Sequence, residues 1–232
     1  MHEKIIAIAF FSCMQIAVIA QAPTEIDRVR TITLVNTDGK PFVNPDLDVE
    51  GTPFYFDSWK YGTIKLVSNN VYNNVSVRLN LQSQEVHFLS QNKTEMTVST
   101  ELVKELFIYD TVNGEVNIYD FQCGFPSIDK QTGKDFYLVI SNGKVKLLQS
   151  IKKEIRQRKD DISGEIKKDF VSYGDYYLYG NNALQLIRLN KNSILQSMSD
   201  GKTKIENFVK INKLSYKSAD DLKKIADYYN TL

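Results

Sequence analysis

Gly51–Leu89 (GTPFYFDSWKYGTIKLVSNNVYNNVSVRLNLQSQEVHFL) is the stretch that decides the expected fold of this 232-residue chain. It contains the single tryptophan and a dense group of aromatic residues. From Val75 to Leu81, valines and leucines alternate with polar residues. A period of two is typical of a β-strand that buries one face and exposes the other. The stretch therefore predicts central strands of a sheet.

Further short strand patterns follow this stretch, and tight turns separate them. Asn113-Gly114 and Asn142-Gly143 each lie between two apolar runs, and Asn-Gly is the strongest short-range signal for a β-hairpin. Strands joined by such short loops are antiparallel neighbours. The charged run Lys152–Lys168 interrupts the pattern, and aromatic strands resume at Asp169.

From Asn190 onward the apolar period changes from two residues to 3.6 residues, which indicates helices. The last of them should begin at Ser218, whose hydroxyl can cap the first free N–H groups of a helix. We therefore predict an α+β fold. Its main part is a mostly antiparallel β-meander in a curved sheet or partly open barrel, and two or three C-terminal helices pack on it.

Residues 1–20 indicate a targeting segment. Lys4 precedes an apolar run that ends at Ala20, which is short for a membrane span but normal for a secretory signal. We expect cleavage before Gln21, with lipidation at Cys13 or an uncleaved anchor as open alternatives. The expected product is exported to the periplasm, the outer envelope or the extracellular space. The expected organisation is a signal peptide (1–20), an antiparallel β body (21–189) and a C-terminal helical tail (190–232).

Composition excludes several kinds of chemistry. The formal net charge of +1 gives no reason to expect a nucleic-acid partner. After signal cleavage Cys123 is the single cysteine and His87 the single histidine, so neither a disulfide nor a histidine- and cysteine-based zinc site is expected. No phosphate-binding or dinucleotide-binding glycine motif occurs. We expect no cofactor and no metal.

Three aromatic residues are candidate ligand-binding residues: Tyr55, Trp59 and Tyr61. Together they could form a platform on which a sugar or another flat ligand stacks. The alternative is that they cap the core, because aromatic side chains bury large areas and dominate cores.

Four basic residues are candidates for contact with an anionic surface: Lys152, Lys153, Arg156 and Arg158. Lipid headgroups or an acidic polysaccharide would fit such a patch. The alternative is a solvated strand edge, because edge lysines discourage aggregation between sheets.

Acidic residues near the aromatic group raise an enzymatic alternative. Asp46, Asp48, Glu50 and Asp57 lie close together in the sequence. Two carboxylates held ~5–10 Å apart across a glycosidic bond are sufficient for its hydrolysis. A carboxylate-dependent hydrolase that acts on a glycan is therefore the alternative function, and no individual residue is assigned as catalytic.

Two passages resemble a broad set of uncharacterised exported proteins of bacteria that have an outer membrane. The first passage is Gly51-Thr52-Pro53-Phe54 with Trp59, Gly62 and Arg78-Leu79-Asn80-Leu81, and the second is the tail from Lys191 to Leu232. The shared features are turn glycines, strand apolar residues and a helical cap. The resemblance implies export and carries no activity.

The expected function is therefore that of an exported envelope or secreted protein, a non-enzymatic binding or structural module. Its expected partner is an apolar ligand, a glycan or an anionic envelope surface, and the sequence does not distinguish among these three.

Overall fold

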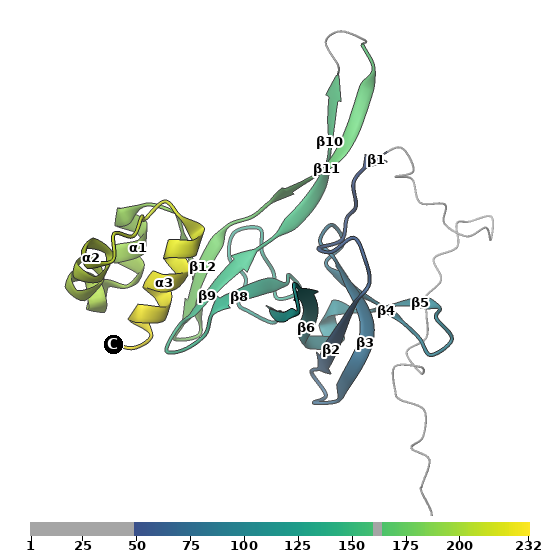
Figure 1. The fold of residues 1–232 in the computed structure, drawn as a ribbon, viewed down its shortest axis with the longest axis horizontal. Coiled ribbons are helices and arrows are strands. Elements are labelled where there is room, and N and C mark those ends of the chain that lie inside the picture. Colours follow the sequence, from purple (N-terminus) through teal and green to yellow (C-terminus); the bar gives the residue numbers. More distant parts are fainter. Residues whose placement is uncertain (1–48, 160–163) are drawn as a thin grey trace, which may run out of the picture. The chain divides into compact units, whose positions relative to one another are not determined.

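The computed structural model describes residues 49–159 and 164–232, and Figure 1 shows their fold. The expected signal segment at 1–20 lies outside these residues. The predicted fold class is confirmed: a mostly antiparallel, curved and unclosed sheet is followed by three C-terminal helices.

The main sheet has ten strands, and every pairing in it is antiparallel. Their spatial order is β13-β12-β9-β8-β7-β6-β2-β3-β4-β5. The strands are β2 Lys60–Leu66, β3 Val71–Asn80, β4 Glu85–Leu89, β5 Glu95–Val98, β6 Val103–Val112, β7 Glu115–Gln122, β8 Tyr137–Ser141, β9 Lys146–Ser150, β12 Tyr176–Gly180 and β13 Ala183–Ile187.

Local sequence explains the central strands. Val77 and Leu79 are fully buried, as the alternation in β3 predicts. Asn113 and Gly114 both have positive φ and join β6 to β7, which is the backbone that a two-residue hairpin turn requires. Gly62 allows β2 to approach its neighbours, because a Cβ there would lie 2.5 Å from the Phe107 carbonyl oxygen. β6 begins directly after a 3-10 turn at Thr100–Leu102.

A second, three-stranded sheet consists of β1 Val49–Glu50, β10 Lys152–Lys159 and β11 Ile166–Tyr173. β10 and β11 form the long two-stranded ribbon in Figure 1, and β1 pairs with β11 in parallel. The sequence indicates an interruption here instead. The ribbon has no buried-face alternation to detect, because most of its side chains are exposed or only half-buried on both faces.

The three helices are α1 Lys191–Ser197, α2 Lys202–Ile211 and α3 Ala219–Tyr229, with a 3-10 turn at Ser199–Gly201. The predicted cap of the last helix is confirmed, since the Ser218 side chain accepts a hydrogen bond from the Asp221 N–H. Asn190 caps α1 in the same way through the Ser193 N–H. None of these helices is long and apolar enough to cross a membrane.

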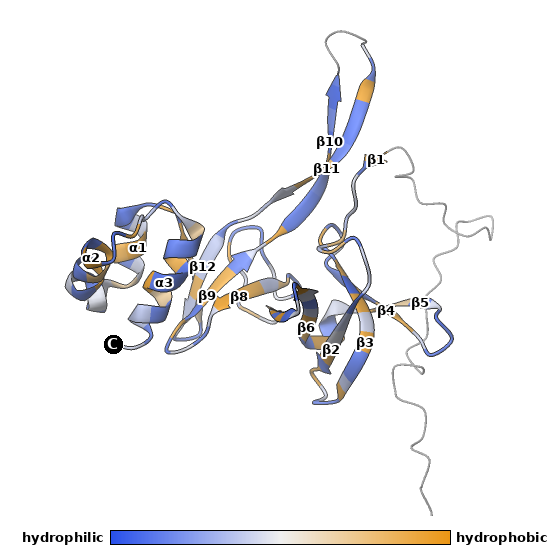
Figure 2. Ribbon diagram, viewed as in Figure 1, coloured by the Kyte–Doolittle hydropathy of each residue, from blue (hydrophilic) through white to orange (hydrophobic). Residues whose placement is uncertain are grey.

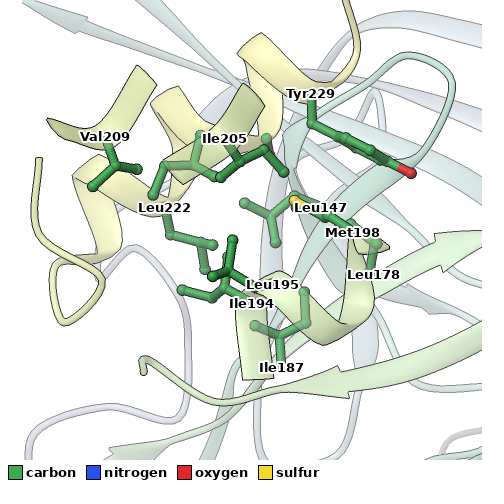
Figure 3. Close-up of a cluster of buried hydrophobic side chains, with 12 residues drawn as sticks. Leu147, Leu178, Ile187, Ile194, Leu195, Met198, Ile205, Val209, Leu222 and Tyr229 are labelled. Atoms are coloured by element: carbon green, nitrogen blue, oxygen red, sulfur yellow. The ribbon is translucent and has the colours of Figure 1, made fainter. Parts of the chain in front are cut away.

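The helices pack on one face of β9, β12 and β13 through a cluster of buried apolar side chains (Figure 3). Leu147, Leu178 and Ile187 come from the strands, and the remainder come from the helices and from Met198, which directly follows α1. In Figure 2 the apolar colour of the helices is confined to stripes, while polar residues cover their other sides. The amphipathic period of the tail therefore produces the core at this end of the sheet.

The opposite face of the same sheet end is also covered. Leu148 follows Leu147 in β9, so its side chain points to the other face. There it joins Phe125, Tyr137 and Tyr177 in a second buried cluster. Phe125 comes from the connection between β7 and β8. β9 and β12 thus have buried side chains on both faces.

Candidate binding surface

The β2–β6–β7 part of the sheet has one face without such a cover. In the strand register Tyr61 lies opposite Tyr109, and Tyr109 lies opposite Ile118. Directly opposed residues project from the same face of a sheet. The next row on this face is Thr63, Phe107 and Asp120. We call this surface the tyrosine face; it comprises Tyr61, Thr63, Lys65, Glu105, Phe107, Tyr109, Val116, Ile118, Asp120 and Gln122.

The two rows of the tyrosine face nearest the Asn113-Gly114 turn contain exposed apolar side chains. Tyr61 is 64% exposed, Val116 61% and Ile118 62%. In β6, Leu106 and Ile108 point to the opposite face of the sheet and are buried. Contiguous exposed apolar side chains on a soluble protein mark surfaces that contact something else. The tyrosine face is therefore the candidate binding surface.

Hydrogen bonds fix the Thr63 hydroxyl beside Tyr109. The Thr63 hydroxyl donates to Asn73 Oδ1 at 3.0 Å, and it shares a second hydrogen bond of 2.9 Å with the Tyr109 hydroxyl. The Tyr109 ring is half-buried, and this bond holds it against the sheet. Tyr109 is consequently a pre-oriented part of the surface, whereas Tyr61 stands further into solvent.

A charged pair borders this group. Lys65 Nζ donates to Glu105 Oε2 at 2.8 Å and lies 4.8 Å from the centre of the Phe107 ring. A cation over an aromatic face is attracted by the negative potential of the ring. The pair thus places one cationic and one anionic group at the edge of the apolar area.

Asp120 is a half-buried acid on this face. Its Oδ2 accepts a hydrogen bond from Gln122 Nε2 at 2.9 Å, and Lys146 Nζ donates to Gln122 Oε1 at 2.7 Å. Asp120 Oδ1 is buried and has no hydrogen-bond partner among the described residues. Burial raises the pKa of this carboxyl above its ordinary value, and the nearby Glu105 raises it further.

The three aromatic candidates lie in different surroundings. Tyr55 packs edge-to-face against Phe121 and Tyr119, and burial raises its pKa to about 12. Trp59 is half-buried over the Arg78 guanidinium. Tyr61 alone among the three is exposed on the tyrosine face. The structure therefore does not gather the three rings into one platform.

Arg78 explains the position of Trp59. Its guanidinium carbon lies 3.9 Å from the centre of the Phe54 ring and 4.1 Å from that of Trp59. The same guanidinium donates to Glu95 Oε1 at 2.9 Å, and His87 Nδ1 lies 2.7 Å from the same oxygen. This stacked and hydrogen-bonded cluster fastens the segment before β2 to β3, β4 and β5.

The four basic candidates also separate into two groups. Lys152 forms an ion pair of 2.6 Å with the buried Asp135. Lys153 Nζ donates to the carbonyls of Thr52 and Phe54, and desolvation lowers its pKa. Both lysines thus hold the β10 end of the ribbon to neighbouring chain.

Arg156 and Arg158 lie further along β10 and are exposed. Arg158 forms an ion pair of 3.0 Å with Asp169 on β11. Both arginine side chains are exposed, and an ion pair at the surface contributes little to stability. The two arginines are therefore accessible to a partner.

Of the four acids proposed for hydrolysis, Glu50 and Asp57 fall in the part of the chain that the structure describes. Asp46 and Asp48 lie outside that part, Asp57 is exposed, and Glu50 belongs to β1. Instead, Glu105 and Asp120 are diagonal neighbours on the tyrosine face. No group of three potential metal-binding side chains occurs in residues 49–159 and 164–232.

Tyr109, Ile118, Glu105 and Asp120 were missed by the sequence reasoning, although one signal could have identified them. A two-residue turn at Asn113-Gly114 fixes the register of its hairpin, because such turns pair the residues on each side of them directly. Counting outward places Tyr109 opposite Ile118, as observed. What the sequence does not reveal is whether another segment covers that face.

Comparison with known proteins gives no match: no family model, no curated protein and no solved structure is significantly similar to this chain. Functional inference therefore rests on the residues and geometry described above.

Proposed function

We propose that this protein is an exported, non-enzymatic binding module whose tyrosine face binds an extended glycan. The observation that carries the proposal is the uncovered row of Tyr61, Tyr109 and Ile118 across three central strands. A broad sheet face suits a chain-like ligand that lies along it, whereas a small molecule would require a concave pocket to bury most of its surface.

The chemistry of the face favours a sugar over a purely apolar ligand. A pyranose ring has an apolar C–H side that can pack on an aromatic ring, and hydroxyl groups around its edge that form hydrogen bonds. Tyrosine offers both an apolar ring and a polar hydroxyl. Lys65 and Glu105 add a donor and an acceptor beside Phe107, one row beyond Tyr109 on the same face.

Export is part of the proposal, and the N-terminal sequence supports it. Lys4 followed by the apolar run to Ala20 has the composition of a secretory signal. A glycan-binding role agrees with that destination, because glycans are abundant at cell surfaces and in the envelope. Intact-mass measurement on the protein from an exporting host should show loss of residues 1–20, and a full-length mass would refute this part.

The binding proposal can be tested on an array of bacterial and plant polysaccharides. We expect the wild-type protein to bind at least one glycan, and Ile118→Ser to reduce that signal. Ile166→Ser is a matched control, because Ile166 is 63% exposed against 62% for Ile118 but lies on the ribbon. Equal loss in both variants, or no binding to any glycan, would contradict the proposal; self-association through Ile118 would indicate a protein partner instead.

A second candidate function is a carboxylate-dependent glycan hydrolase, and the pair Asp120 and Glu105 supports it. Burial raises the pKa of Asp120, which suits a general acid. Glu105 lies diagonally across the strand pair, where backbone positions are typically ~7–8 Å apart. If this function is correct, the glycan found on the array should release reducing ends and Asp120→Asn should abolish the release. Asp57→Asn should leave it unchanged. Absence of release from the bound glycan would exclude the hydrolase and retain the binding module.

A further inference from the structure

A pocket with a volume of about 460 Å³ lies in the helical tail, far along the chain from the tyrosine face. Val209, Leu214 and Tyr216 provide its apolar lining. Val209 is buried in the helical core, and Leu214 and Tyr216 are packed against that core. The pocket is more open than enclosed, so a ligand there would keep part of its surface in solvent. Its volume falls within the ~300–1,000 Å³ range of small-molecule sites.

Charged side chains surround this apolar lining, and lysine predominates among them. Lys191 Nζ forms an ion pair of 2.9 Å with Glu206 Oε1, so these two charges largely compensate each other. Lys210 and Lys213 also line the pocket. Neither has an ion-pair partner within the described part of the chain. The pocket therefore presents two uncompensated cations beside an apolar surface.

Lys213 has a left-handed backbone conformation. Its φ is +54°, and it follows α2 in a Schellman-type ending, in which the Leu214 N–H donates to the Val209 carbonyl at 3.0 Å. Glycine is the preferred residue at this left-handed position, because a Cβ is disfavoured there. A glycine in place of Lys213 is therefore expected to preserve this helix ending.

We propose that this pocket binds a small organic anion with an apolar or aromatic body. Lys210 and Lys213 bind the anionic group, and Val209, Leu214 and Tyr216 pack against the body of the ligand. The site is independent of the tyrosine face and of its glycan. A ligand without a charge leaves the two lysines without a partner, and an inorganic anion leaves the apolar lining in contact with water.

A simpler role for the lysines makes a different prediction. Cations near a helix C-terminus stabilise it through the helix dipole, and Lys210 lies in the last turn of α2. If that is their whole role, they affect stability and do not affect a ligand. Lys213→Gly separates the two roles, because glycine relieves the left-handed backbone while it removes the charge.

The test uses two fluorescent probes of similar shape, anilinonaphthalene sulfonate and the uncharged N-phenyl-naphthylamine. We expect the wild-type protein to bind the sulfonate more tightly than the uncharged probe. Lys213→Gly should weaken sulfonate binding about tenfold, or ~1.4 kcal/mol, without lowering the thermal unfolding midpoint. Lys210→Ala should weaken it similarly.

The matched control is Lys204→Ala, which removes a lysine from the same helix at an exposed position that does not line the pocket. It should leave the dissociation constant unchanged. Equal weakening by Lys204→Ala would overturn the proposal in favour of a general charge effect. Equal binding of the two probes, or wild-type affinity in Lys213→Gly, would also overturn it. Ile118→Ser should not alter sulfonate binding, and a loss there would assign the probe to the tyrosine face.

Discussion

Two parts of the ten-stranded sheet have the same kind of residue on the same face with opposite results. At the β8–β9–β12–β13 end, Tyr177 is 2% exposed beneath Phe125 and its neighbours. In the central strands β2, β6 and β7, Tyr61 is 64% exposed. Both tyrosines are in strands and have apolar neighbours. The difference is that the β7–β8 connection covers one part, while no described segment covers the other.

This comparison separates what a tyrosine does for stability from what it offers to a ligand. At the covered end the rings exclude water and pack in edge-to-face contacts, such as that between Tyr137 and Tyr177. In the uncovered central strands the rings are oriented by the sheet but leave their faces in solvent. Changes at the covered end should therefore act on folding, and changes in the uncovered central strands on binding.

The largest expected effect is on stability at the covered end. Leu148 is fully buried, so Leu148→Ala should reduce the free energy of unfolding by about 2–5 kcal/mol through the lost burial and the cavity left behind. Ile118→Ala, on the exposed tyrosine face, should change the free energy of unfolding by no more than about 0.5 kcal/mol. Urea unfolding monitored by circular dichroism measures both. Similar losses in the two variants would show that the tyrosine face is covered in solution.

A smaller loss is expected at the strand contact that supports the tyrosine face. In Gly62→Ala the new Cβ would lie 2.5 Å from both the Phe107 carbonyl oxygen and Val77 Cγ2, and overpacking of this kind costs about 1–3 kcal/mol. Gly133→Ala is the control, because its Cβ would come no closer than 3.4 Å to another residue. Denaturant midpoints should therefore separate the two variants. A wild-type midpoint for Gly62→Ala would indicate a different approach of β2 to β6.

The smallest expected effect is the pH dependence that Asp120 contributes. Because burial raises its pKa in the folded state, the folded protein binds this proton more readily than the unfolded chain does. The free energy of unfolding should therefore decrease as the pH rises from the ordinary value of 3.8 through the raised pKa. Asp120→Asn removes this contribution.

Unfolding free energies measured from pH 3 to pH 8 compare the two proteins. Asp120→Asn should gain stability relative to the wild-type protein as the pH rises, and the two should converge at the acidic end. A constant difference across the range would contradict the assignment of the titration to Asp120.

Much of the fold could be predicted from local sequence, since local interactions determine it. The alternation in β3, the Asn-Gly turn before β7 and the Ser218 cap all form as their residue types require. The β10–β11 ribbon could not be predicted in this way, because its two faces are both largely solvated and no period of buried residues marks it.

The candidate surface was less accessible to prediction, because exposure is a property of tertiary structure. Tyr55 and Tyr61 belong to the same aromatic stretch, yet one is packed against Phe121 and the other is in solvent. Lys153 likewise has the sequence of a surface patch but donates to two backbone carbonyls. Whether a ring or a cation remains accessible to a ligand depends on contacts with segments distant in sequence. Patterns in a single sequence do not encode those contacts.

The measurement that most directly tests whether the tyrosine face is the binding surface is the dissociation constant of the array-identified glycan for two matched variants. Tyr61→Ala removes a ring that is 64% exposed on the tyrosine face, and Tyr173→Ala removes one that is 50% exposed on the ribbon. Loss of one contacting ring should weaken binding by about 1–2 kcal/mol, roughly fivefold to thirtyfold. We predict this weakening for Tyr61→Ala and wild-type affinity for Tyr173→Ala. Wild-type affinity in Tyr61→Ala would contradict the account.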